Sequence, residues 1–145
     1  MKNSVIKIYV VIISITLFSC STQPEPIRYG EDSCHFCEMT IVSQAHAAQA
    51  VSSKGKQFKY DAIECMMNDI INNQTEMAVK LVANFASPGE MLDAENAGYI
   101  INDSINSPMG ANLAAIEMKN NQDLYTWEEL KSQFKGENTV TVNNQ

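Results

Sequence analysis

Four side chains that bind soft metal ions occur within six residues of one another. Cys34, His35, Cys37 and Met39 offer two thiols, an imidazole and a thioether. Thiolate and thioether ligands select soft, low-valent ions such as Cu(I), and imidazole binds several of the same metals. The spacing therefore predicts a soft-metal site, provided that the fold brings enough of these donors to one point.

Two cysteines separated by two residues also occur in other kinds of site. A thioredoxin-like redox pair lies at the start of a helix, whereas residues 39–44 are predicted here as a strand. Covalent haem requires a histidine where this chain has Glu38, and a zinc site requires a second matched pair. Only Cys65, His35 and His46 are available for such a pair. A disulfide across so short a loop stabilises little. These four alternatives stay open beside the soft-metal site.

Strand geometry suggests which donors would act together. Alternation along residues 39–44 would place Cys37 and Met39 on one face, where a single ion takes both sulfur atoms. Met109 is a further candidate ligand, because packing rarely requires a methionine in a turn such as residues 107–110. We interpret Cys65 as a small buried residue of a helix, and His46 as a turn or surface histidine.

Residues 1–19 have the pattern of an export signal. Two lysines precede an apolar stretch at residues 8–18, which is shorter than the roughly 20 residues that span a bilayer. The four residues ending at Cys20 resemble a bacterial lipobox, which predicts lipid attachment to Cys20 and anchoring without a membrane span. Ser21 is compatible with sorting to the outer membrane. The alternative is a secreted protein with a stray cysteine.

Charge and cysteine count narrow the classes of partner. Removing the signal leaves eight basic residues against seventeen acidic ones, a formal charge of −9. That sign argues against nucleic acid or anionic lipid headgroups as partners. Apart from Cys20, three thiols remain, so in an oxidising compartment at least one thiol is reduced or metal-bound.

The rest of the chain predicts one α+β body between two irregular ends. We expect residues 20–33 to be a flexible linker after the lipidated cysteine and residues 137–145 to be a disordered tail. Between them lie two small strand-and-helix units, residues 34–75 and 76–136. We predict strands at residues 39–44, 47–52, 57–60, 77–86, 99–101 and 113–118, a hairpin turn at residues 53–56, and a loop or single turn at residues 92–98.

Both predicted helices carry the same start signal. Asp61 and Glu64 form a capping box for a helix that ends at residues 72–73, and Thr126 and Glu129 form one for a helix that ends at Gly136. A shift of 65 residues places the first half on the second, with matches between Ala50 and Ala115, Val51 and Ile116, Tyr60 and Tyr125, Asp61 and Thr126, and Glu64 and Glu129. This weak repeat predicts a duplicated strand–strand–helix unit.

The order of short motifs along residues 34 to about 130 resembles the NosL family. The motifs are Cys37-x-Met39-x-Ile41, Ala47-Ala48-Gln49, Gly55 ahead of Phe58-x-Tyr60-Asp61, Cys65-Met66, and Pro108-Met109-Gly110 followed by Ala114-Ala115. Each motif alone is weak, but their combination and order are specific.

The resemblance implies a copper-chaperone lipoprotein associated with maturation of nitrous oxide reductase. It implies two homologous units related to the core of organomercurial lyase, Cu(I) as cargo, and metal-ligand roles for Cys37, Met39 and Met109. Some family members have a histidine two residues after the loop methionine, where this chain has Ala111. Cys34, and less strongly His35, could replace that ligand.

Two classes of function follow. The first is a non-enzymatic Cu(I) carrier, a monomer or weak dimer, that passes its ion to a partner reductase by ligand exchange. The second is a periplasmic enzyme that uses Cys34 and Cys37, either in thiol–disulfide exchange or in organomercurial-lyase-like bond cleavage. A structural lipoprotein with a disulfide between these cysteines is a third possibility.

Overall fold

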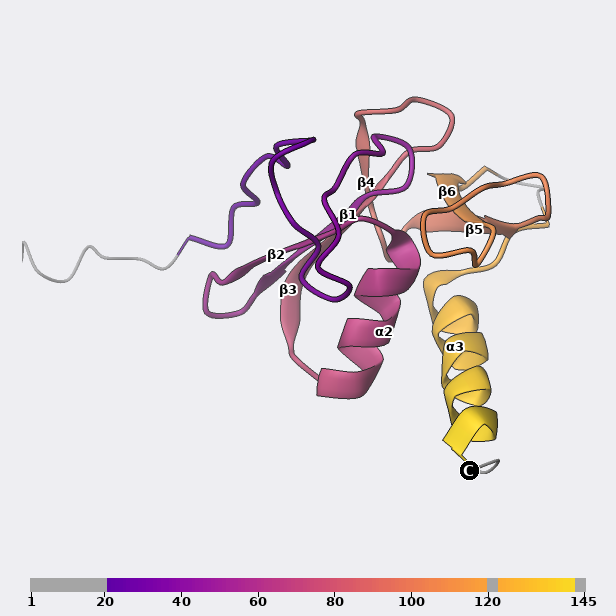
Figure 1. Ribbon diagram of the computed structural model, residues 1–145. Coiled ribbons are helices and arrows are strands. Elements are labelled where there is room, and N and C mark those ends of the chain that lie inside the picture. The colour runs from indigo at the N-terminus through magenta and orange to yellow at the C-terminus, as the bar shows by residue number, and fades with distance from the viewer. Residues whose placement is uncertain (1–20, 120–122, 143–145) are drawn as a thin grey trace, which may run out of the picture.

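Two antiparallel β-sheets and two helices form the part of the chain that the computed structural model describes, residues 21–119 and 123–142 (Figure 1). Side chains are described up to Gly136. One sheet has the strand order β2-β1-β3-β4, and the other pairs β5 with β6. The elements are β1 (Ala48–Ser52), β2 (Gln57–Tyr60), α2 (Ile63–Asn73), β3 (Met77–Ala83), β4 (Met91–Asp93), β5 (Ala97–Ile101), β6 (Leu113–Glu117) and α3 (Trp127–Val142).

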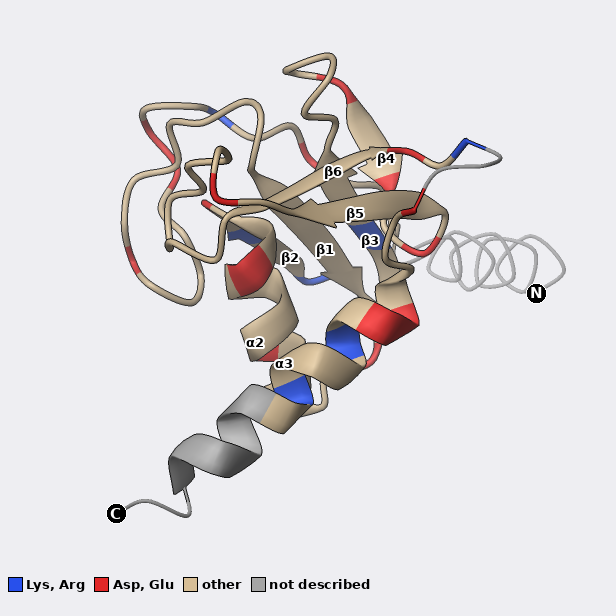
Figure 2. Cartoon of the chain, turned by 90° about the vertical axis from the view of Figure 1, so that its right-hand side faces the viewer, with Lys and Arg blue, Asp and Glu red and all other residues tan. Residues whose placement is uncertain are grey.

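The sheets are joined just after β3, and the helices cover one side of them. Asn84 bridges Ala115 of β6, and the Phe85 N–H donates to the Ala115 carbonyl at 2.8 Å. Helix α2 packs against β1 and β2, α3 packs against β5, and the two helices contact each other (Figures 1 and 2). This arrangement confirms the predicted α+β class.

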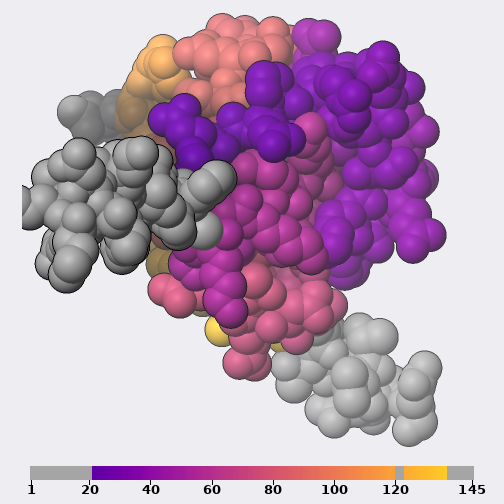
Figure 3. Space-filling view, turned by 90° about the vertical axis from the view of Figure 1, so that its left-hand side faces the viewer, coloured from indigo at the N-terminus to yellow at the C-terminus, as the bar shows by residue number. Residues whose placement is uncertain are grey.

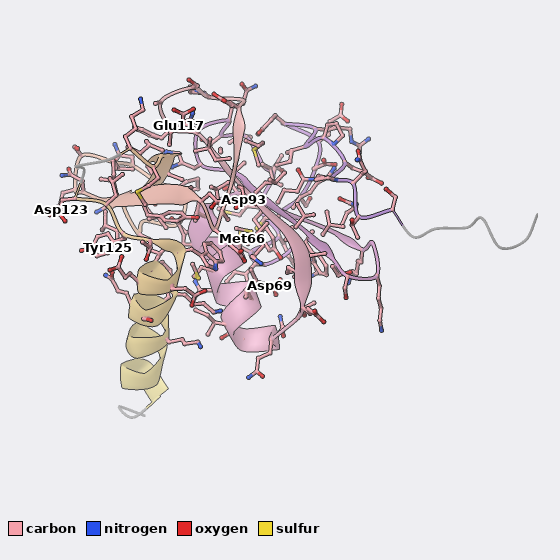
Figure 4. All side chains as sticks on the ribbon, turned by 180° about the vertical axis from the view of Figure 1, so that it is seen from behind. Met66, Asp69, Asp93, Glu117, Asp123 and Tyr125 are labelled. Atoms are coloured by element: carbon pink, nitrogen blue, oxygen red, sulfur yellow. The ribbon has the colours of Figure 1, made fainter. Side chains whose placement is uncertain are left out.

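Helix α2 supplies most of the core beneath the larger sheet. Met66 is fully buried, and it projects from α2 together with Asp69 (Figure 4). The Tyr60 hydroxyl donates to Asp69 Oδ2 at 2.7 Å, which gives a buried carboxylate a partner on β2. The apolar spacing that predicted this helix therefore marks its buried face.

The central strand β1 is buried along its whole length because both of its faces are covered. Ala48 and Ala50 belong to the core cluster that includes α2, and their small side chains let the helix approach closely. Gln49 and Val51 point to the opposite face by strand alternation. The Gln49 amide donates to the carbonyl of Glu25, so residues ahead of the first strand cover that face.

Residues 21–32, here called the N-terminal arm, are fixed on the sheet and do not form the expected flexible linker. Ile27 and Tyr29 pack against the core. Three further hydrogen bonds hold the arm: Gln57 Nε2 to the Gln23 carbonyl (3.0 Å), the Glu25 N–H to Gln57 Oε1 (3.1 Å) and Lys59 Nζ to the Pro26 carbonyl (2.9 Å). Figure 3 shows the arm, in indigo, crossing the surface of the domain. Polar side chains of β2 thus form hydrogen bonds with the backbone of the arm.

One predicted strand and one predicted loop were wrong. Residues 39–44 form no strand; within that stretch only Thr40 pairs, through a single bridge to Ser33. The chain turns sharply just before, at Glu38, whose φ is 64°. In contrast, residues 92–98, expected as a loop or turn, contribute most of β4 and the start of β5, separated by a turn at Asp93.

The two helices differ from prediction at opposite ends. Helix α3 starts with the predicted capping box, in which Glu129 Oε2 accepts from the Thr126 N–H at 2.8 Å and the Thr126 hydroxyl accepts from the Glu129 N–H. It continues past Gly136 to Val142. Helix α2 ends at Asn73 as predicted, but its N-cap residue is Ala62, with no side-chain hydrogen bond.

The proposed duplication stays a prediction. A hairpin precedes each helix, and β6 falls where a shift of 65 residues would carry β1. The pairing differs, however: β2 pairs with β1, whereas Tyr125 bridges Tyr99 of β5 and not β6. The predicted signal and the Cys20 anchor lie outside the described residues. Among the residues that are described, no helix is both long and apolar enough to cross a membrane.

Candidate metal centre

Cys34 and Cys37 lie on a tight backbone turn, which we call the thiol turn (residues 34–39). The Cys34 N–H donates to the Met39 carbonyl at 2.8 Å, and the Glu38 N–H donates to the Cys34 carbonyl at 3.0 Å. The left-handed conformation of Glu38 costs about 1–2 kcal/mol. Cys37 and Met39 therefore flank a chain reversal. The prediction that they share one face of a strand was wrong.

The thiol turn is fastened to β2 by its own backbone and by Asp32, two residues ahead of it. The His35 N–H donates to the Lys59 carbonyl at 2.8 Å. The Lys59 ammonium lies 2.6 Å from Asp32 Oδ2, and both side chains are largely buried. This ion pair at the entry of the turn fixes the direction in which the two cysteines leave the sheet.

Helix α2 brings a third thiol to the turn. The Sγ atoms of Cys34, Cys37 and Cys65 all lie within 4.8 Å of one another. Cys34 and Cys65 are 2% and 1% exposed, Cys37 is half-buried, and all three thiols are free. Three sulfur atoms about 2.3 Å from a shared ion would lie about 4 Å apart. Small side-chain movements are enough to reach that spacing.

The pKa values of the three thiols are shifted in different directions. A hydrogen bond from the Cys65 thiol, supported by backbone N–H groups of Cys37, Asp61 and Phe36, lowers the pKa of Cys34 to about 4. The same hydrogen bond, together with burial, raises the pKa of Cys65 far above its usual value. Burial also raises the pKa of Cys37. The cluster thus holds one thiolate readily, and a bound cation would favour loss of the other two protons.

The two acids expected to cap α2, Asp61 and Glu64, instead accept hydrogen bonds from residues of other segments. Asp61 Oδ1 accepts from the Val42 N–H at 3.4 Å, and the Asp61 N–H donates to the Cys34 sulfur. Glu64 Oε1 accepts from the Ser107 hydroxyl, while Glu64 Oε2 is buried with no partner within the described structure. The capping box predicted for α2 is therefore wrong, and its two carboxylates tie α2 to other segments.

The hydrogen bond between Glu64 and Ser107 connects the Met109 loop (residues 107–110) to α2, the helix that carries Cys65. Met109 follows Ser107 by two residues, and its side chain is 45% exposed. Met39, at the end of the thiol turn, is 44% exposed, and its N–H donates to the Cys37 sulfur. Both thioethers predicted as ligands are accessible, as a transfer site requires, and their roles as ligands stay predictions.

The two histidines lie outside the three-sulfur group. The His35 ring packs edge-on against Phe58, with ring centres 4.8 Å apart. His46 is 7% exposed, its Nδ1 lies 3.2 Å from the Leu113 carbonyl, and its ring lies against Phe85. His46 lies at the end of a turn, as expected, but it is buried there and not on the surface, and it contacts Leu113 of β6.

A family model named NosL matches residues 28–129 of this chain. That range holds the thiol turn, helix α2 and the Met109 loop, and it makes up more than half of the chain. The chain belongs to the NosL family. No match was found among curated proteins.

The fold of this NosL-family chain is similar to a solved structure. The crystal structure of the copper chaperone NosL from Shewanella denitrificans matches with a TM-score of 0.63. The match covers 75% of this chain and 96% of that one, at 14% sequence identity. Because the identity is so low, the likeness shows the shared fold alone.

Cys65 is the member of the three-thiol cluster that sequence reasoning missed. Its place within an apolar helix made it look like a small core residue, and it is indeed buried. The odd number of thiols was the available signal, because it left one cysteine in need of an explanation. The contact of Cys65 with the thiol turn is a tertiary contact, and local sequence spacing does not predict it.

Proposed function

We propose that this NosL-family chain binds Cu(I) and delivers it to a periplasmic nitrous oxide reductase. The observation that carries the proposal is the convergence of the Cys34, Cys37 and Cys65 sulfur atoms within 4.8 Å. Soft thiolates in low coordination numbers favour Cu(I) over harder ions. The acidic character of the exported chain is also compatible with a cation as cargo.

The proposed ligand set joins sequence and structure. Cys34, Cys37, Met39 and Met109 come from the sequence and the family resemblance, and Cys65 is added by its place in the fold. His35 is the weakest candidate because its ring packs on Phe58. We assign the three thiolates to the resting site and the two exposed thioethers to loading and release.

Transfer would proceed by ligand exchange. A sulfur or imidazole of the acceptor approaches from the side of Cys37, the most accessible of the three thiols, and displaces that ligand first. The buried Cys34 and Cys65 leave afterwards. Each step exchanges one donor for another, so the ion is never released into solution, and no covalent bond of a substrate is broken.

The anchor completes the proposed setting. Cys20, with its lipid, would hold the domain on the periplasmic side of the outer membrane, as a monomer or weak dimer that needs no nucleic acid. A periplasmic thiol–disulfide or organomercurial-lyase-like enzyme remains the competing class. The position of the thiols supports the carrier, because Cys34 and Cys37 lie on a turn and not at the start of a helix.

Anaerobic titration of the reduced protein with Cu(I), against a competing chelator, tests the proposal. We expect one tightly bound ion per chain. Cys65→Ser should weaken Cu(I) binding by more than about 100-fold, since loss of a ligand exceeds the 10–100-fold cost typical of its supporting groups. Absence of tight, stoichiometric binding would contradict the carrier function, and wild-type affinity in Cys65→Ser would remove Cys65 from the ligand set.

A matched pair of methionines tests the thioethers. Met109 and Met118 are 45% and 43% exposed, but only Met109 lies on the loop tied to α2. Met109→Leu should slow Cu(I) transfer to an acceptor, whereas Met118→Leu should leave it unchanged. Equal transfer rates in both variants would exclude a role for Met109.

A further inference from the structure

The chain leaves the domain at a defined point beside the β1–β2 hairpin. A side chain added at Gly55 would place its Cβ 2.9 Å from the Ser21 carbonyl oxygen, so Ser21 lies directly against this turn. The hydrogen bonds of the N-terminal arm to Gln57 and Lys59 hold the following residues along β2. Cys20 directly precedes Ser21 in the sequence, so a lipid carried by Cys20 would be attached one residue from this turn.

The hairpin tip, residues 53–56, carries two lysines without a carboxylate partner. Lys54 and Lys56 are both exposed, and neither forms an ion pair in the described structure; the Lys56 ammonium lies over the Phe58 ring. Asp69 and Glu76 line the same hollow, but neither forms an ion pair with Lys54 or Lys56 among the described residues. The tip therefore carries two positive charges that no carboxylate contacts directly in the described structure.

Most of the other basic residues in the described structure form ion pairs. Five of them pair with acids: Arg28 with Asp32 and Glu31, Lys59 with Asp32, Lys80 with Glu95, Lys119 with Glu117, and Lys131 with Glu128. The exported chain as a whole is strongly acidic. The net charge argues against anionic headgroups as partners of the domain as a whole, but the hairpin tip is a local exception: an anionic surface would repel most faces of the domain and attract the tip.

We propose that the hairpin tip is a membrane-docking surface, which rests on the anionic phospholipid headgroups beside the lipidated Cys20. This proposal rests on the lipid anchor of the proposed function. Because the arm is fixed to the sheet, the anchor leaves no slack between the membrane and the tip. Each lysine close to an anionic surface adds about a fivefold preference for that surface. The anchor and the two lysines therefore select one orientation.

The docked orientation sets where the metal centre stands. The thiol turn is fastened to Lys59 of β2, three residues beyond Lys56. A strand rises about 3.4 Å per residue, so this attachment lies about 10 Å from the tip. The thiols would be held close above the membrane surface, and a copper acceptor would have to approach along that surface.

Tryptophan quenching in vesicles tests the orientation on the full, lipidated chain. Ser53→Trp places a probe at the tip, and Ser132→Trp places a matched probe on the exposed face of α3; the native Trp127 is buried and gives a common background. The vesicles contain phosphatidylethanolamine and phosphatidylglycerol, with nitroxide-labelled headgroups as quencher. We expect strong quenching of Ser53→Trp and weak quenching of Ser132→Trp.

Two further variants separate the causes. A flexible Gly-Ser spacer inserted between Cys20 and Ser21, and the double variant K54E/K56E, should each reduce quenching at the tip while flotation with vesicles and Cu(I) binding persist. Equal quenching of both probes in a protein that floats would overturn the docking surface alone. Failure of the wild-type chain to acquire lipid and float would overturn the anchor and the docking surface together.

Discussion

The two helices begin with the same sequence signature but are built differently at their first turns. At α3, Thr126 and Glu129 satisfy each other's backbone groups in a local box exposed to solvent. At α2, Asp61 and Glu64 are buried and bond to Val42 and Ser107, and the helix starts without a side-chain cap. The first turn of α3 stabilises its own helix. The first turn of α2 connects that helix to Val42 and to Ser107.

Glu64→Ala should have the larger effect on stability. The variant leaves the buried Ser107 hydroxyl without its acceptor and detaches the Met109 loop from α2. Loss of such a buried hydrogen bond costs about 2–3 kcal/mol. Urea unfolding measures this change in the free energy of unfolding. A loss no larger than that of a cap substitution at α3 would show that the contact between Glu64 and Ser107 does little for the fold.

Thr126→Ala should cost about 1 kcal/mol, the usual value of an N-cap side chain. Because the box at α3 lies away from the thiol turn, Cu(I) affinity should be unchanged, whereas Glu64→Ala should slow Cu(I) transfer through the loosened Met109 loop. Competition titrations and transfer assays on the two variants check this contrast. A weakened Cu(I) affinity in Thr126→Ala would break the distinction between the two helix starts.

The pH dependence of stability should have opposite signs at the two starts. Burial raises the pKa of Asp61, so the native state holds that proton more tightly and wild type loses stability relative to Asp61→Asn as pH rises above about 4. The Thr126 N–H and hydroxyl lower the pKa of Glu129. Its contribution is present above the unfolded pKa and is lost as pH falls, so wild type loses its advantage over Glu129→Gln on acidification.

Urea unfolding of wild type and both variants between about pH 3 and pH 7 covers the range in which these carboxyls titrate. The expected effects are the smallest of the series, but their signs differ, and that makes them diagnostic. The same sign for both variants would mean that Asp61 and Glu129 have similar surroundings after all.

Features of the fold that depend on local patterns could be predicted from the sequence. Strand alternation and the turn at Gly55 gave the hairpin of β1 and β2, and apolar spacing gave α2. The box of Thr126 and Glu129 formed because both side chains are exposed and have no competing partner. In these places the local preference and the tertiary structure agree.

The predictions failed where tertiary contacts compete with local rules. Asp61 and Glu64 have the sequence of a cap, but burial brought other partners within reach. Residues 39–44 include β-branched side chains, yet they follow the turn at Glu38, and the Met39 N–H donates to the Cys37 sulfur and not to a neighbouring strand. The N-terminal arm looks like a linker because its partners, Gln49, Gln57 and Lys59, lie far along the chain.

The family resemblance and the structure contributed different parts of the candidate site. The motifs around Cys37, Met39 and Met109 pointed to soft-metal chemistry. Only the fold shows that Cys65 meets Cys34 and Cys37, and that Ser107 fixes the Met109 loop to the same helix.

A crystal structure of the reduced protein loaded with Cu(I), with anomalous data at the copper edge, tests the central claim most directly. We expect a single strong anomalous peak within about 2.3 Å of the Sγ atoms of Cys34, Cys37 and Cys65, a typical metal–thiolate distance. A peak bound by Met109 or His35 but distant from Cys65, or a disulfide between two of the three cysteines with no copper bound, would contradict the three-thiolate centre.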